Sequence, residues 1–128
     1  MQKFRIALKL IFLTVLTSCD SQTEWSDGNY QVRWIDTPEL SLTYRNAHGQ
    51  IMTLIDPDIT GIGANQKLIV VRHRVHASST VSYFLVHKQT FEKSQIAESP
   101  SIEHLTEAEY LNASKNPDWP RISSEFHY

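Results

Sequence analysis

The strongest strand signal in the chain is KLIVVRHRV, at residues 67–75. From Leu68 to Val71 the run is apolar at every position, which is typical of a central strand covered on both faces. Its second half turns basic, so we expect that half to emerge toward solvent. The run therefore predicts a sheet that is covered on each side of this strand.

Weaker strand signals flank this run. Tyr30, Val32 and Trp34 alternate with polar residues, as in a strand with one buried face. Turn residues recur at intervals of about 8–12 residues, the spacing of an antiparallel meander. The predicted strands cover residues 30–35, 40–45, 50–55, 59–63, 67–75 and 81–88. We expect a mainly β fold that borders on the α+β class. It should be an antiparallel β-meander of about five to six strands in a single sheet, with one short C-terminal helix.

The helix is predicted at about residues 106–115. Thr106, followed three residues later by Glu109, is a capping-box pattern. The Asn-Pro pair that follows ends the helix, because proline cannot continue it. Packing the helix on the sheet, with Trp119 folding back beside it, is the simplest way to bury the apolar faces.

Size and composition limit the chemistry. The chain has 128 residues, room for one small domain, and its single cysteine excludes a disulfide framework and a multi-cysteine zinc site. Zinc needs three or four convergent ligands, and the six histidines are too scattered to supply them. The paired carboxylates are explained by a turn at 56–58 and by helix capping at 107–109. We expect no metal, no cofactor, no catalytic residues and hence no enzyme.

The N-terminus has the layout of a secretory signal. Three basic residues and no acidic ones accompany an apolar run at residues 10–16, and the small residues Thr17 and Ser18 follow. The uncharged stretch, residues 10–19, is too short to span a bilayer, because a transmembrane helix needs ~20 mostly apolar residues.

The sequence Leu16-Thr17-Ser18-Cys19 resembles the lipobox of bacterial lipoproteins. In that family the signal is cut before the cysteine, here between Ser18 and Cys19, and a lipid is attached to the cysteine sulfur. The resemblance implies a palmitate-type anchor on Cys19 that holds the protein at the cell membrane, facing the periplasm or the cell exterior. Asp20 resembles the residue that retains such proteins in the inner membrane. The alternative is that Cys19 is an unmodified thiol at the end of an ordinary signal.

Removing the signal, residues 1–18, changes the charge balance. The whole chain carries a net charge of −2; the mature chain keeps nine basic and fourteen acidic residues, a net charge of −5. This excludes nucleic-acid binding based on overall charge, and an anionic membrane does not attract such a domain. Residues 19–29 are mostly polar and predict a flexible tether, and residues 30–128 predict a single small β-rich domain.

Three short segments carry a second resemblance. They are WID at residues 34–36, IGANQK at 62–67 and YFLVHK at 83–88. Together they are similar to a pattern in small bacterial lipoproteins of unknown function, where an acidic residue often replaces His87. The resemblance supports the meander and implies no catalytic residue.

A basic stripe is the one candidate binding surface. Arg72, Arg74 and His76 project to one side of a strand, because side chains two residues apart share a face. Such a stripe on an acidic domain suits an acidic partner, a lipid headgroup or an anionic glycan. The alternative is a solvated strand end whose charges discourage edge pairing.

Three functions are compatible with these observations. The leading hypothesis is a membrane-tethered, non-enzymatic domain that binds another protein or an envelope component, for example an immunity or inhibitor lipoprotein that intercepts a toxin or a hydrolase. The second is a structural accessory subunit of an envelope complex. The third is an envelope hydrolase, for which the sequence offers no nucleophile and base.

Overall fold

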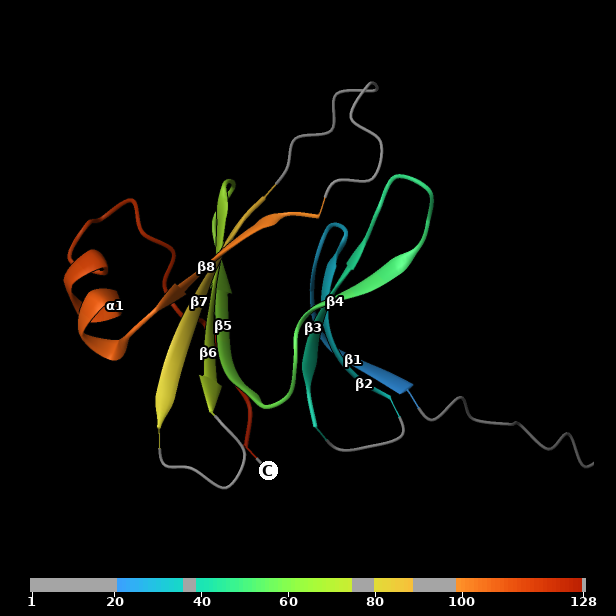
Figure 1. The fold of residues 1–128 in the computed structure, drawn as a ribbon, viewed down its shortest axis with the longest axis horizontal. Helices are drawn as coiled ribbons and strands as arrows, with labels where there is room; N and C mark the ends of the chain where they lie inside the picture. The colour runs from blue at the N-terminus through green and yellow to red at the C-terminus, as the bar shows by residue number, and fades with distance from the viewer. Residues whose placement is uncertain (1–20, 36–38, 75–79, 89–98, 128) are drawn as a thin grey trace, which may run out of the picture.

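The described part of the chain forms two antiparallel sheets that pack face to face, with one helix on the outer side of the second sheet (Figure 1). The computed structural model describes residues 21–35, 39–74, 80–88 and 99–127. The predicted signal, its cleavage site at Ser18 and Cys19, and the neighbouring Asp20 lie outside these residues.

The first sheet has the order β1-β2-β3-β4 and is formed by Ser21–Asp27, Tyr30–Ile35, Ser41–Arg45 and Ile51–Ile55. The second has the order β8-β7-β6-β5-β9 and is formed by Ser101–Leu105, Val81–His87, Leu68–Arg74, Ile59–Ala64 and Ser124–Glu125. The mainly β class with one short helix is confirmed.

The predicted single sheet of five to six strands is wrong in its strand number and layering. The described residues contain nine strands. Three of them, β1, β8 and β9, were not predicted from the sequence. These three lie at sheet edges, where a strand needs only one ladder of backbone hydrogen bonds and little apolar alternation. The first four residues of β8 are all exposed, so its sequence carries no burial pattern.

The predicted polar tether at residues 19–29 is also corrected. Ser21–Asp27 form β1 and pair with β2 along the whole strand, with a register shift between Thr23 and Trp25. Trp25 is partly buried and packs against the core between the sheets. Backbone pairing and this one aromatic anchor order a segment whose other side chains are polar.

The main core lies between the two sheets. It joins apolar side chains of β2, β3 and β4 to those of β5, β6 and β7. The fully buried members are Val32, Leu42, Tyr44, Ile59, Ile62, Ile69, Val71 and Val86.

Strand β6 is the central strand that its sequence predicts. Ile69 and Val71 point into the main core, whereas Val70 points to the opposite face and joins a second cluster with Tyr83, Leu85 and Leu105. Ile69, Val70 and Val71 are all completely buried. The second sheet is therefore covered on both faces at β6.

The second cluster is covered by the helix. The helix α1 spans Glu107–Ala113 and begins with the predicted capping box, in which Thr106 Oγ1 accepts from the Glu109 N–H and the Glu109 carboxylate accepts from the Thr106 N–H. Tyr110 stacks on Tyr83 of β7, with ring centroids 3.9 Å apart. With only seven residues, the one helix of the described chain falls short of the length and apolar character that crossing a bilayer requires.

Burial raises the pKa of the Tyr83 hydroxyl above its ordinary value of 10.0, and the negative charge of Glu107 adds to this effect while Arg72 opposes it. A tyrosine whose pKa is higher in the folded than in the unfolded chain contributes stability below the unfolded value and loses it as the pH rises further. The Tyr83 hydroxyl therefore enters the stack in its neutral form at physiological pH.

The chain after α1 crosses the outer face of β5 and ends as β9. The Ser123 N–H donates to the Ile62 carbonyl, and the Phe126 N–H donates to the Thr60 carbonyl, both at 3.0 Å. The backbone passes so close to Gly63 that a Cβ placed there would lie 1.7 Å from the Arg121 carbonyl oxygen. Only glycine fits at this crossing.

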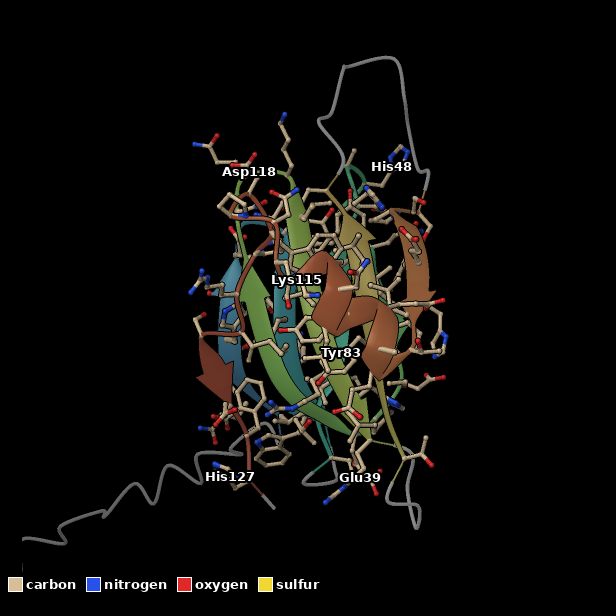
Figure 2. All side chains as sticks on the ribbon, turned by 90° about the vertical axis from the view of Figure 1, so that its left-hand side faces the viewer. Glu39, His48, Tyr83, Lys115, Asp118 and His127 are labelled. Carbon is tan, nitrogen blue, oxygen red and sulfur yellow. The ribbon has the colours of Figure 1, made fainter. Side chains whose placement is uncertain are left out.

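The sandwich has two distinguishable ends (Figure 2). Asp118 and His48 stand at one end, and Glu39 and His127 stand at the other. We refer to them as the Asp118 end and the Glu39 end.

We expect Gly63→Ala to destabilise the fold by about 1–3 kcal/mol, because the new methyl group collides with backbone and forces residues 121–122 off the sheet. Urea unfolding followed by tryptophan fluorescence measures the change. Gly61→Ala is the matched control, because its Cβ would meet only the side-chain ends of Arg72 and Ile122, at 3.0 Å. An equal loss in both variants would contradict the proposed backbone collision.

Candidate functional site

Within the predicted basic stripe, Arg72 is engaged in contacts inside the fold. The Arg72 guanidinium donates to the Thr60 hydroxyl and carbonyl, both at 3.0 Å, and pairs with Glu125 at 3.1 Å. Arg72, which lies on β6, therefore links β5 to β9. Arg74 is exposed at the end of β6, and His76 lies outside the described residues, so a partner-binding role for these two stays a prediction.

A more organised cluster lies at the Asp118 end, where an ion pair joins the two sheets. The Lys88 ammonium, just after β7, pairs with the Asp27 carboxylate at the end of β1. It also donates to the Asn65 carbonyl at 2.6 Å. The Lys88 side chain is only 15% exposed, so this contact is a shielded clamp between the sheets.

Asn65 organises the turn between β5 and β6. Its Oδ1 accepts from the backbone N–H groups of Lys67 and Leu68, at 2.9 and 2.8 Å. Its Nδ2 donates to the Asp118 carbonyl at 2.9 Å, and its own N–H donates to the Leu68 carbonyl. A single asparagine therefore shapes the turn and ties it to the segment after α1.

The predicted strands at residues 59–63 and 67–75 leave residues 64–66 as their connection, but the sequence does not predict the long-range contacts of this turn. Asn65 contacts Lys88 and Asp118, which follow it in the sequence by 23 and 53 positions. Lys88 pairs with Asp27, which precedes it by 61 positions. The only available signal was that Asn65 and Lys88 both stand in the short segments similar to other small lipoproteins.

Two hollows flank this turn. The first, which we call the turn pocket, has a volume of about 780 Å³, is open to solvent and is lined by residues 65–68 and 116–119. The second, the inter-sheet pocket, has a volume of about 490 Å³ and lies over the Lys88–Asp27 pair, between residues 25–27 and 64–66. Asn65 and Gln66 belong to both.

The wall of the turn pocket contains an unusual donor. Trp119 is partly buried and packs against the second cluster while it lines the pocket. Its indole Nε1 is shielded from solvent and has no acceptor among the described residues. The predicted packing of Trp119 back onto the sheet is thus confirmed, and it brings an aromatic ring to the hollow.

The described residues offer little for catalysis or metal binding. They contain no group of three or more histidine, cysteine or acidic side chains that could hold a metal ion. His87 lies 3.6 Å from Glu103, but both side chains are about half exposed and neither lines the two hollows. His73 contacts the Pro57 carbonyl through Nε2. The site is therefore a polar end with two hollows and an internal clamp.

Comparison of the chain with models of known families, with curated proteins and with solved structures gave no match.

We expect Lys88→Met to lower the free energy of unfolding by about 1–2 kcal/mol, because it removes a charged hydrogen bond and leaves Asp27 without its partner. Lys67→Met is the matched control: this lysine is exposed and its ammonium has no partner among the described residues. A double-mutant cycle with Asp27→Asn measures the pair directly, and additive effects would contradict the clamp.

Proposed function

We propose that this protein is a bacterial lipoprotein, held at the membrane by lipid on Cys19, whose β-sandwich binds another protein or an envelope component without catalysing a reaction. Its specific form is an immunity or inhibitor protein. The single observation that carries the proposal is the lipobox-like sequence Leu16-Thr17-Ser18-Cys19 directly ahead of a small folded domain.

The position of β1 supports this arrangement. Ser21, two residues after Cys19, pairs with Ile35, whereas the last residue of β1, Asp27, is clamped to Lys88 at the Asp118 end. A seven-residue strand is about 20 Å long. Lipid on Cys19 then holds the Glu39 end near the bilayer and presents the Asp118 end, with both hollows, away from it.

The chemistry at the Asp118 end supports binding rather than catalysis. Lys88 and Asp27 neutralise each other, and Asn65 uses its polar groups to shape the turn. The mature charge of −5 suits a basic partner, since complementary charge steers association.

We expect Cys19→Ser to abolish lipid attachment and to release the protein from the membrane fraction, because a hydroxyl does not replace the thiol in thioether formation. Metabolic labelling with a palmitate analogue, followed by fractionation of the producing bacterium, measures both effects. Ser18→Ala is the matched control, since it keeps a small residue before the cleavage site. Mass spectrometry that finds the initiator methionine on the native protein would end the proposal.

We expect the inhibitor form to give a one-to-one complex with a basic secreted toxin or hydrolase encoded beside it, when the two are co-expressed and sized by light scattering. Photo-crosslinking from position 66 at the Asp118 end should trap this partner. The accessory-subunit alternative gives the opposite pattern: crosslinking from position 74 would trap a resident envelope protein in cells without the toxin.

A further inference from the structure

We propose that the turn pocket, between residues 65–68 and 116–119, binds a neutral oligosaccharide. The pocket volume of about 780 Å³ falls in the range of ligand sites, roughly 300–1,000 Å³. Its openness to solvent suits a chain-like ligand that enters from one side and continues beyond the pocket.

The rim of the pocket is held rigid before any ligand arrives. Asn65 Nδ2 fixes the Asp118 carbonyl, and Asn116 Oδ1 accepts from the Asp118 N–H at 3.0 Å. The Trp119 N–H donates to the Asn116 carbonyl at 3.1 Å. The backbone of this rim is already ordered, so the loss of conformational entropy on binding is confined to the side chains that contact the ligand.

The polar groups that remain available match hydroxyl groups. The side chains of Gln66, Lys67 and Asp118 are exposed and make no hydrogen bond to any described residue. An amide both donates and accepts, an ammonium only donates, and a carboxylate only accepts. Sugar hydroxyls both donate and accept, so they can satisfy all three groups together.

The charges that line the pocket favour a neutral ligand over an anionic one. Lys67 and Asp118 are the charged side chains that line the pocket, and their charges cancel. A phosphate or a carboxylate sugar would gain one cation and be repelled by one carboxylate. A neutral ligand avoids this repulsion.

Trp119 supplies the remaining contact. One part of its side chain packs on the second cluster, which fixes the ring, and the residue also lines the pocket. The face of an aromatic ring carries partial negative charge, and it attracts the weakly positive C–H groups of a sugar ring. Amide groups beside a fixed indole thus offer both the polar and the apolar contacts that a pyranose needs.

The inference rests on the proposed function in one respect, that lipid on Cys19 places the pocket among the glycans outside the cytosol. The pocket itself is a property of the folded domain.

The test uses the lipidated protein in a detergent without a sugar headgroup, with its tryptophans labelled for indole N–H spectra. The neutral trisaccharides of N-acetylglucosamine and of glucose are titrated separately. We expect at least one of them to shift the Trp119 signal saturably while the Trp34 signal stays in place. Trp119→Phe assigns the signal.

Gln66→Ala combined with Asp118→Ala should raise the dissociation constant about tenfold or more, because two hydrogen bonds to the ligand are lost. Both residues are exposed, so the fold is retained. Lys115→Ala is the matched control: it is an exposed residue of the same segment that does not line the pocket.

Three results would overturn the inference: no saturable shift with either trisaccharide, an unchanged dissociation constant in the double variant, or tighter binding of an acidic trisaccharide than of a neutral one. Lipid attachment and partner capture have separate readouts, so failure of the sugar titration leaves the proposed function standing. Conversely, if the native protein binds the sugar but carries no lipid, the proposed function is overturned and the inferred sugar site stands.

Discussion

The architecture depends on the burial of β6 on both of its faces. Neighbouring side chains of a strand point in opposite directions, and Ile69, Val70 and Val71 are all completely buried. Each such side chain stabilises the fold by about 1.5–3 kcal/mol relative to its exposed state. Three consecutive buried residues therefore require a layer on either side of the second sheet. The first sheet provides one layer, and α1 with the following segment provides the other.

The same strand leads to the candidate site. The turn that brings the chain into β6 is the one shaped by Asn65, and the next strand, β7, delivers Lys88 to the carbonyl of that asparagine. The clamp to Asp27 then joins this end of the second sheet to the first. The two hollows lie on either side of a turn that the core strands hold in place, so their shape is a by-product of core packing.

The sequence predicted what depends on local pattern. The central strand predicted at residues 67–75, the connection left at residues 64–66 and the capping box at Thr106 each follow from residues close together in the chain. The structure contains all three, with the strand at Leu68–Arg74. The second sheet was missed because its separation from the first is decided by which faces meet, and edge strands such as β8 have exposed side chains without alternation. No local pattern distinguishes Lys88 from an ordinary surface lysine, because the carboxylate that pairs with it lies 61 positions away.

The entry of the chain through an edge strand has a mechanical consequence. With lipid on Cys19, tension between the bilayer and an object held at the Asp118 end runs along the length of β1. Such a load shears the whole β1–β2 ladder at once, from Ser21 to Asp27, rather than peeling it open one rung at a time. Hydrogen bonds loaded in parallel share the force, so a domain anchored in the proposed way would resist tension without losing β1 one residue pair at a time.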